Sequence, residues 1–402
     1  MQIYLFGDFR LDVAERRLTR DGENVPLRPK VFDTLVELVR NAGRLVDKAA
    51  LFQAVWPETV VEEGNLAHNV SILRKALGEG KTDQEYIETV PKRGYRFVAQ
   101  VAVEGDGARP APTAVATEAQ ALPEQRIAFT VTADGVRIAY ATSGEGPPLV
   151  KAANWLNHLE FDWRSPVWHH VMRELSTGRM LVRYDERGNG LSDWGAEDLS
   201  FEAFVTDLEA VVDAVGLDRF PLLGISQGCA VSIAYAVRHP ERVTRMVLHG
   251  GYAKGWRLRG GEELSGWREG LVEMIRHGWG RDVPGFRQIF ASIYIPDATP
   301  EQTQWWTDLQ RVTASPENAA RLLETLGRID VVDLLPKVSV PTLVTHSRGD
   351  AGIPFFAGKA LAQGIPGARF LPLESDNHLI LAHEPAWPIW RSAVRGFLAD
   401  SG

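Results

Sequence analysis

The sequence predicts two folded units of different class, an α+β unit followed by a doubly wound α/β unit. The chain has 402 residues, which is more than one small core requires. Residues 104–125 are rich in Pro, Ala, Thr and Glu without apolar periodicity, as in a semi-rigid linker. Strands precede three helices before this segment, whereas strands and helices alternate after it. We therefore expect a first domain over 1–103, the linker over 104–125 and a second domain over 126–402.

The first domain is expected to begin with short strands, continue through three helices and close on a hairpin. Its strands are expected at 3–6, 9–13, 17–20, 86–90 and 95–101. Its helices are expected at about 29–41, 48–55 and 62–77, where apolar residues recur at helical spacing. The hairpin turns through Pro91, Lys92, Arg93 and Gly94, and glycine at position 94 permits a tight turn.

The third expected helix has an apolar stripe on one side and small or polar residues on the other. Leu66, Val70, Leu73 and Leu77 form the stripe and are expected to face a core. The opposite face suits entry into a major groove of DNA, although a solvated helix face has the same composition. Cations at the hairpin tip, which reach phosphates or a minor groove, favour DNA binding. The expected DNA-contacting residues are His68, Asn69, Ser71, Arg74, Lys75, Lys92, Arg93 and Arg96.

Four runs of sequence in this domain carry a family resemblance. They are FGDFRLD at 6–12, LRPKVFDTL at 27–35, NVSILRKALG at 69–78 and YIETVPKRGY at 86–95. Together they resemble the OmpR/PhoB-type winged helix-turn-helix domain, especially its ToxR/CadC-like branch. The resemblance implies that the partner is double-stranded DNA, read in the major groove and contacted by the wing. One departure is Ile72, where related domains often carry a basic residue. A homodimer is a further expectation, because a single winged helix binds a short site weakly.

The second domain is expected to hold a mostly parallel sheet whose strands alternate with helices. The strands fall near 127–132, 136–142, 148–152, 180–184, 219–224, 243–249, 341–346 and 368–373. Residues 253–337 interrupt this alternation with helical, Trp-rich sequence, which predicts a helical lid over the carboxyl edge of the sheet. All but one of the 12 Trp follow the linker. Those in the lid either line an apolar pocket or pack the lid onto the sheet.

A serine motif, Gly224-Ile225-Ser226-Gln227-Gly228, lies where the fifth of these strands meets a helix. Glycines at both ends relieve crowding around a strained turn, which is the context a nucleophilic serine of this kind requires. A serine hydroxyl also needs a base and an orienting carboxylate. His378 and Asp350, each just after one of the last two strands, are expected to supply them. Asp376 is an alternative acid, although it lies only two residues from His378.

Catalysis at a serine also needs hydrogen-bond donors for an oxyanion. One expected donor is the backbone N–H of Gln227 at the helix N-terminus, where the dipole favours negative charge. The other is expected from the loop after the third strand, from the backbone of Asn154 or Trp155.

The serine motif is accompanied by further matches over most of the second domain. RYDERGNGLSD at 183–193 and the acid and histidine loops at 341–354 and 373–378 complete the pattern. Residues 126–402 thus resemble the α/β-hydrolase superfamily. The superfamily's usual His-Gly in the oxyanion loop is replaced here by Ala152-Ala153. Esterases, lactonases, C–C hydrolases and non-catalytic receptors share this pattern, so the resemblance does not fix a substrate.

Composition and charge narrow the remaining possibilities. The net charge is −8, and it belongs to the part after residue 103, which we expect to stay outside a DNA interface. The lone Cys229 excludes an internal disulfide, fits a reducing cytoplasm and is expected to be a small packed residue. No apolar run reaches the roughly 18–20 residues of a membrane helix. Neither a metal nor another cofactor is expected.

Two functions of different class fit this combination. The first is a one-component transcriptional regulator whose hydrolase-like domain binds, and in one version hydrolyses, a small apolar ester- or lactone-like ligand to control DNA binding. The alternative is an active serine hydrolase of the carboxylic ester type with an accessory winged helix. A third interpretation uses the winged helix for protein contact only. The sequence leaves open whether Ser226 is catalytic.

Overall fold

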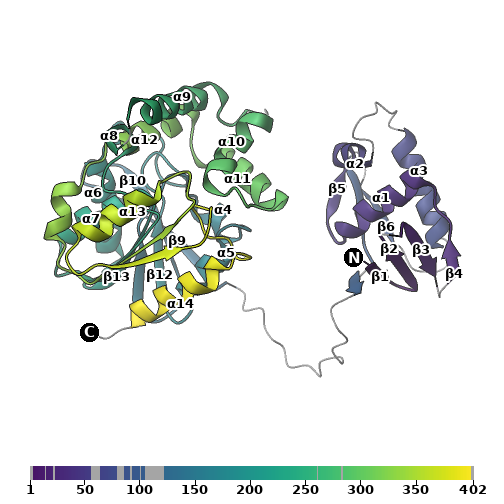
Figure 1. The fold of residues 1–402 in the computed structure, drawn as a ribbon, viewed down its shortest axis with the longest axis horizontal. Coiled ribbons are helices and arrows are strands. Elements are labelled where there is room, and N and C mark those ends of the chain that lie inside the picture. Colours follow the sequence, from purple (N-terminus) through teal and green to yellow (C-terminus); the bar gives the residue numbers. More distant parts are fainter. Residues whose placement is uncertain are drawn as a thin grey trace. The chain divides into compact units, whose positions relative to one another are not determined.

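The computed structural model describes residues 3–13, 15–20, 23–55, 64–78, 86–90, 93–99, 101–104, 122–259, 261–281 and 284–399. The chain forms two compact units, residues 1–117 and residues 118–402 (Figure 1). The first is α+β and the second is α/β with a mostly parallel sheet, which confirms the expected fold classes. None of the described helices is both long and apolar enough to cross a membrane.

The described part of the N-terminal unit holds two small sheets and three helices. One sheet has the strand order β4-β3-β2-β1-β8 and the other has the order β5-β7-β6. The strands are β1 (Ile3–Phe6), β2 (Phe9–Asp12), β3 (Arg17–Arg20), β4 (Glu23–Val25), β5 (Leu45–Asp47), β6 (Ile87–Val90), β7 (Gly94–Phe97) and β8 (Ala102–Glu104). The helices are α1 (Pro29–Arg40), α2 (Lys48–Val55) and α3 (Gly64–Leu77).

The core of this unit is built from the apolar stripe of α3 and a cluster of aromatic rings. Leu66, Val70, Leu73 and Leu77 are all at most 1% exposed, which confirms the predicted stripe. The rings of Phe6 and Phe97 meet edge to face with their centroids 5.0 Å apart. Such edge-to-face pairs are favourable beyond the apolar area they bury. The described outer residues of α3 are therefore held at a fixed orientation above a packed core.

The hairpin of β6 and β7 is fixed by a third strand that the sequence did not reveal. Asp47 at the end of β5 pairs with Gly94 at the start of β7. A Cβ atom at Gly94 would lie 2.0 Å from the carbonyl oxygen of Val46. Glycine is thus required at position 94 by the close approach of the neighbouring backbone, and its φ is not positive, so the tight turn we expected needs no left-handed backbone there.

The described part of the C-terminal unit is built on an eight-stranded sheet with the order β16-β15-β14-β13-β11-β12-β10-β9. Strands β11 to β16 pair with one another in parallel, whereas β10 pairs antiparallel with both β12 and β9. The strands are β9 (Gln125–Val131), β10 (Arg137–Ser143), β11 (Pro148–Lys151), β12 (Met180–Tyr184), β13 (Phe220–Ile225), β14 (Val243–His249), β15 (Thr342–Ser347) and β16 (Arg369–Leu373).

Helices flank this sheet, and a group of them gathers at one end of the unit (Figure 1). The helices between strands are α4 (Leu159–Trp163), α5 (His169–Ser176), α6 (Phe201–Val215), α7 (Gly228–Arg238), α13 (Phe355–Gly364) and the final α14 (Ala386–Ala399). The gathered helices are α8 (Trp256–Arg259), α9 (Glu262–Gly278), α10 (Pro284–Tyr294), α11 (Pro300–Thr313) and α12 (Pro316–Arg328), followed by the 3₁₀ helix η1 (Val332–Lys337). We refer to α8–α12 as the lid.

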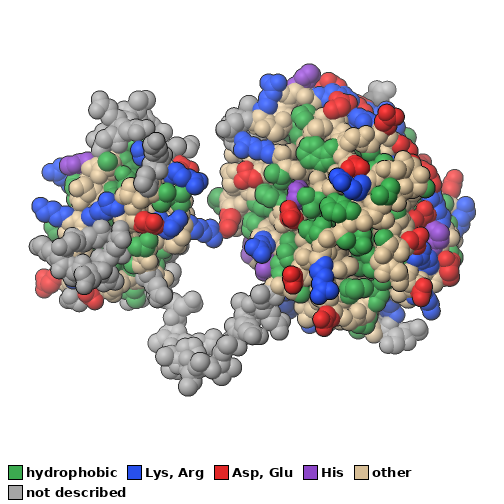
Figure 2. All heavy atoms as spheres, turned by 180° about the vertical axis from the view of Figure 1, so that it is seen from behind, with side chains coloured by type: hydrophobic (Ala, Val, Ile, Leu, Met, Phe, Trp, Pro, Cys, Tyr) green, Lys and Arg blue, Asp and Glu red, His purple; other side chains and the backbone are tan. Residues whose placement is uncertain are grey.

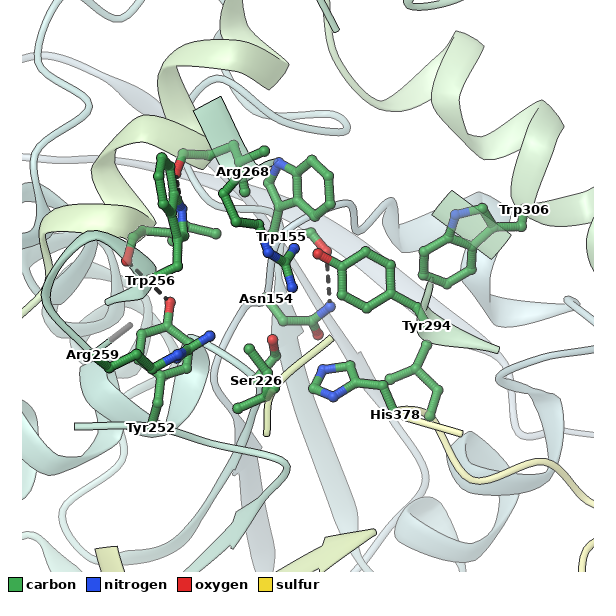
Figure 3. Close-up of a pocket in the computed structure, with 14 residues that line it drawn as sticks. Asn154, Trp155, Ser226, Tyr252, Trp256, Arg259, Arg268, Tyr294, Trp306 and His378 are labelled. Atoms are coloured by element: carbon green, nitrogen blue, oxygen red, sulfur yellow. Dashed lines mark hydrogen bonds between the residues drawn. The ribbon is translucent and has the colours of Figure 1, made fainter. Parts of the chain in front are cut away.

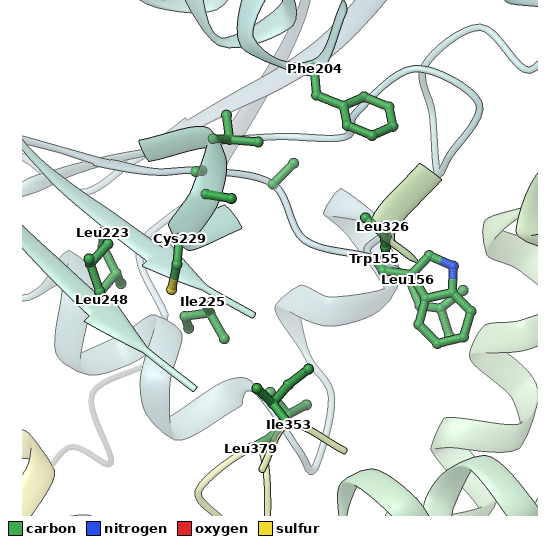
Figure 4. Packing of buried hydrophobic residues seen from close by; sticks show 14 of the residues in the cluster. Trp155, Leu156, Phe204, Leu223, Ile225, Cys229, Leu248, Leu326, Ile353 and Leu379 are labelled. Carbon is green, nitrogen blue, oxygen red and sulfur yellow. The ribbon is translucent and has the colours of Figure 1, made fainter. Parts of the chain in front are cut away.

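The centre of the C-terminal unit is packed with apolar side chains from β13, β14 and α7. Cys229 lies among Leu223, Ile225 and Leu248 in this core (Figure 4). Its thiol is fully buried and burial raises its pKa above the ordinary value. A thiol with a raised pKa forms little thiolate, so Cys229 is a packed residue as predicted and not a second nucleophile.

Candidate functional site

The serine motif forms a sharp turn between β13 and α7. Ser226 has a φ of 57°, in the left-handed region that side-chain-bearing residues rarely adopt. A Cβ atom at Gly224 would lie 2.6 Å from the Gly228 carbonyl oxygen, and one at Gly228 would lie 2.6 Å from the Ala153 carbonyl oxygen. Both glycines are therefore needed for the turn to close. The strain at Ser226 is held by this packing, as in the nucleophile elbow that the sequence predicted.

His378 and Asp350 meet beside this turn. The Nδ1 atom of His378 lies 2.6 Å from Oδ2 of Asp350, and both side chains are buried. Burial opposes ionisation of Asp350, but the adjacent His378 outweighs it and holds the pKa of the carboxyl below its ordinary value. The Nε2 atom of His378 is buried without a hydrogen-bond partner among the described residues, and the ring faces Ser226 (Figure 3). A base with a free Nε2 and an oriented Nδ1 is what proton transfer from a serine requires.

Two further histidines support this pair without lining the pocket. His249 bonds through Nε2 to the carbonyl oxygen of His378 over 3.1 Å. His346 lies 3.6 Å from Asp350 and bonds to the carbonyl oxygen of Ile353. The alternative acid, Asp376, is exposed to solvent. The geometry therefore favours Asp350 over Asp376 as the partner of His378.

The predicted oxyanion donors differ in their availability. The backbone N–H groups of Gln227 and Asn154 have no hydrogen-bond acceptor among the described residues. The backbone N–H of Trp155, by contrast, donates to Oε1 of Gln227 over 2.6 Å. Since this donor is already engaged, we correct the prediction for Trp155 and retain Gln227 and Asn154 as the candidate oxyanion pair.

Buried polar side chains contact the oxyanion loop and Gln227, the residue after Ser226. Nε2 of Gln227 donates to Oε2 of Glu186 over 2.8 Å, and Nζ of Lys151 donates to Oδ1 of Asn154 over 2.5 Å. Burial raises the pKa of Glu186 to about 8 and lowers that of Lys151 to about 8. Both shifts reflect the cost of charge in a water-poor environment. This network takes the place of the usual His-Gly and fixes the loop by side-chain contacts.

A pocket opens at Ser226 and His378, with an empty volume of about 530 Å³ that is partly open to solvent. Its wall is largely aromatic, and the rings that line it are Trp155, Trp256, Trp306, Tyr252 and Tyr294 (Figure 3). Trp279 instead packs against Trp155, with ring centroids 6.1 Å apart. Some lid tryptophans, such as Trp256 and Trp306, therefore line the pocket, whereas Trp279 packs the lid onto the rest of the unit.

Two arginines, Arg259 and Arg268, also line this pocket. Sequence reasoning missed them because their place on the lid gives no sign of which side chains turn inward. Only the packing of α8 and α9 distinguishes these two from Arg257 and Arg276, which are partly exposed. No group of three or more His, Cys, Asp and Glu side chains suited to a metal ion occurs in the described part of the chain.

In the N-terminal unit, the outer face of α3 and the hairpin present a second candidate site. His68, Ser71 and Lys75 are exposed on α3, and Arg93 is exposed in the turn of the hairpin. Lys and Arg side chains are spread over the face of this unit visible in Figure 2. These residues are accessible to a DNA duplex, as the sequence predicted.

Other predicted DNA contacts have internal partners instead. Asn69 is 7% exposed and donates to Oγ1 of Thr34 over 3.0 Å, so it ties α3 to α1, and its prediction as a base contact is corrected. Arg74 donates to the carbonyl oxygen of Ile87 over 2.6 Å and so braces α3 against β6. Arg96 forms an ion pair with Glu88 across the hairpin at 2.9 Å. Lys92 lies outside the described residues.

The fold and the serine site define the class of this protein. Residues 164–385, more than half of the chain, match the family described as alpha/beta hydrolase fold, and the chain belongs to that family. Residues 22–97 match the domain described as transcriptional regulatory protein, C terminal. The chain is thus a transcription-regulator DNA-binding domain of the OmpR/PhoB type fused to an α/β hydrolase.

Individual relatives resemble one unit or the other. The AB hydrolase superfamily protein YisY of Bacillus subtilis is 26% identical over 62% of this chain and 91% of its own length. The transcriptional regulator HilA of Salmonella typhi is 37% identical, but over only 27% of this chain and 19% of its own length. The solved esterase from Exiguobacterium antarcticum shares the hydrolase fold with a TM-score of 0.58, at 24% identity over 68% of this chain and 99% of that chain.

Proposed function

We propose that this protein is a one-component transcriptional regulator, acting in the cytoplasm, whose hydrolase unit binds and cleaves a small apolar ester- or lactone-like ligand. Occupancy of the pocket at Ser226 then changes the affinity of the winged helix for DNA. The observation that carries the proposal is the contact of His378 with Asp350 at a strained serine turn, inside an aromatic pocket, in a chain that also has a DNA-binding domain.

The proposed chemistry is acyl transfer through Ser226. Its Oγ attacks the ester carbonyl carbon while Nε2 of His378 takes the hydroxyl proton, and the N–H groups of Gln227 and Asn154 stabilise the oxyanion. The oxyanion collapses, the C–O bond to the alcohol breaks, and the alcohol leaves with the proton from His378. Water then attacks the acyl-enzyme with the same base, which releases the acid and restores Ser226. Asp350 orients His378 and stabilises its protonated form throughout.

The proposed DNA interface consists of the outer face of α3 and the hairpin turn. His68 and Ser71 are assigned to base edges, and Lys75 and Arg93 to phosphates. Arg74 and Arg96 act indirectly, since the contact of Arg74 with Ile87 holds the hairpin against α3 and the ion pair of Arg96 with Glu88 joins the two strands of the hairpin. Binding as a homodimer would give two half-sites and the affinity that one unit lacks.

Labelling of Ser226 tests the hydrolase half of this proposal. A fluorophosphonate probe is expected to modify the full chain at Ser226 and to leave Ser226→Ala unlabelled. Turnover of short 4-nitrophenyl esters is expected in the wild type and not in Ser226→Ala. Absence of both labelling and turnover would contradict hydrolysis. Labelling and turnover in a chain that binds no DNA would instead support the alternative, an esterase with an accessory winged helix.

A further inference from the structure

The two arginines in the pocket differ from their neighbours on the lid in having no acidic partner. Arg257 pairs with Glu269 at 2.6 Å and Arg276 pairs with Glu324 at 2.8 Å, both on the lid. No carboxylate among the described residues lies within ion-pair distance of Arg259 or Arg268. Arg257 and Arg276 are thus paired within the lid, whereas the two arginines that line the pocket have no described carboxylate at ion-pair distance.

Arg268 is held in the pocket with a donor unused. It is 4% exposed, and its Nη2 atom donates to the carbonyl oxygen of Gly352 over 2.5 Å. Its Nε atom is buried without a hydrogen-bond partner among the described residues. The guanidinium points from the lid into the pocket that Ser226 lines (Figure 3). A buried cation with an unsatisfied donor is costly for the free protein, so it calls for an anionic partner.

Arg259 repeats the pattern on the neighbouring helix. Its guanidinium stacks on the ring of Tyr252 at 4.5 Å and donates to the carbonyl oxygen of Lys254 over 3.1 Å. Its Nε atom is likewise buried without a described partner. Burial, together with the nearby charge of Arg268, lowers the pKa of Arg259, although a guanidinium stays protonated at neutral pH. Two cations therefore line a pocket whose other walls are mainly aromatic and aliphatic.

We infer that this pocket has an anion subsite, formed by Arg268 and Arg259, that binds a carboxylate on the ester or lactone acted on at Ser226. The inference rests on the proposed function and narrows its ligand from an apolar ester to one that also carries a carboxylate. A guanidinium presents its donors in one plane, which matches the two oxygens of a carboxylate. The aromatic rings of the pocket accept the flat or apolar remainder of the ligand.

The test compares two esters that differ in charge, 4-nitrophenyl hemiglutarate and 4-nitrophenyl pentanoate, on the full chain. The wild type is expected to prefer the charged ester by 10-fold or more in kcat/KM, mainly through a lower KM. Arg268→Met is expected to lower kcat/KM for the hemiglutarate about 10- to 100-fold, the range for a lost charge-assisted hydrogen bond, and to affect the pentanoate far less. Arg268→Lys keeps the charge and is expected to retain part of the preference.

Control variants show whether Arg268 binds the anion or only supports the structure of the pocket. Arg276→Met, which removes a lid arginine that has an acidic partner, is expected to leave the preference for the hemiglutarate intact. An equal loss for both esters in Arg268→Met, with Arg268→Lys no better, would overturn the subsite, since Arg268 would then only position the Gly352 loop. No preference for the charged ester in the wild type would overturn it as well.

Binding without turnover keeps the inference testable if hydrolysis fails. If the wild type cleaves neither ester, the hydrolytic part of the proposed function is contradicted. Calorimetric binding of glutarate to Ser226→Ala, weakened at least 10-fold by adding Arg268→Met, still supports the subsite, and equal binding by both variants overturns it. Tighter binding of propylphosphonate than of butyrate would overturn the carboxylate assignment in favour of a phosphorylated ligand.

Discussion

The backbone N–H of Trp155 donates a hydrogen bond to the side chain of Gln227 over 2.6 Å. The residue after the nucleophile therefore holds the loop that carries Asn154. The Nε2 atom of the Gln227 side chain donates to Oε2 of Glu186 over 2.8 Å. One buried side chain thus joins the serine turn, the oxyanion loop and the turn after β12. This contact explains how the loop is fixed although Ala152-Ala153 replaces the usual His-Gly.

Replacing Gln227 by Met is expected to loosen the oxyanion loop. Two buried hydrogen bonds are lost, and each orphaned partner costs about 1–3 kcal/mol, so the C-terminal unit should lose about 2–6 kcal/mol of its free energy of unfolding. Ester turnover should fall roughly 10²-fold, since a small displacement of reacting groups has that effect. Urea unfolding followed by tryptophan fluorescence reports the stability, because all but one Trp follow residue 117. Gln304→Met, at an exposed site on α11, is the matched control.

The raised pKa of Glu186 predicts a pH-dependent stability. A carboxyl with a folded pKa of about 8 and an ordinary value of 4.5 binds its proton in the folded state over a range where the unfolded chain has released it. Its contribution is complete below about pH 4.5 and is lost as the pH rises through 8. The free energy of unfolding should therefore fall between these values, by at most about 1.4 kcal/mol per pH unit for this group.

Glu186→Gln should flatten that dependence, because an amide has no proton to lose. The slope that remains is expected from three other buried carboxyls, since burial raises the pKa of Asp185 to about 7 and those of Asp162 and Asp207 to about 6. Urea titrations at pH 5, 6, 7 and 8 measure the slopes. Glu374→Gln, at an exposed site, serves as the control. Identical slopes in the wild type and Glu186→Gln would show that Glu186 is ionised in the folded protein throughout this range.

Removal of exposed cations from the N-terminal unit should weaken DNA binding in a salt-dependent way. Lys75→Ala and Arg93→Ala are each expected to reduce the slope of log K against log salt by about 1, because each phosphate contact releases counterions. Fluorescence anisotropy of a labelled duplex over a range of salt concentrations gives the slopes. Lys359→Ala, in the hydrolase unit, is the matched control. An unchanged slope in both N-terminal variants would exclude them from the interface.

Asn69 is expected to affect the stability of the N-terminal unit, whereas Lys75 is expected to affect its affinity for DNA. Asn69→Ala removes the buried hydrogen bond to Thr34 and should cost the N-terminal unit about 1–2 kcal/mol. Amide hydrogen exchange of the full chain, which resolves the two units, is the measurement. The base preference of the DNA site should stay the same. A change of preference without a loss of protection in α1 and α3 would return Asn69 to the DNA interface.

Most of the elements and the sharp turn at Ser226 could be predicted from the sequence because local patterns determine them. The stripe of α3 follows from helical spacing, and the turn at Ser226 follows from glycines at 224 and 228 beside an apolar strand end. The placement of Asp350 next to His378 follows from strand ends that meet at one edge of a parallel sheet. The short strand β5 (Leu45–Asp47) was not predicted, because three residues are too few to show an alternating pattern. It forms through its pairing with β7.

Side-chain partners could not be predicted because they depend on tertiary packing. The sequence assigned Asn69 to DNA from its position on α3, but α1 buries it. The sequence also predicted the backbone N–H of Trp155 as an oxyanion donor, but this N–H donates to the side chain of Gln227. Arg268 was missed for the same reason, since only the packing of α9 turns it into the pocket while Arg276 on the same helix stays outside.

The proposed coupling of the two units requires that occupancy at Ser226 change the DNA affinity of the same chain. Its test is the affinity of the full chain for a duplex selected from a random-sequence pool, measured before and after complete fluorophosphonate labelling of Ser226. We expect a change of at least about fivefold, the usual lower range for coupling between two sites, and no change in Ser226→Ala treated in the same way. Equal affinities of the labelled and unlabelled wild type would contradict it.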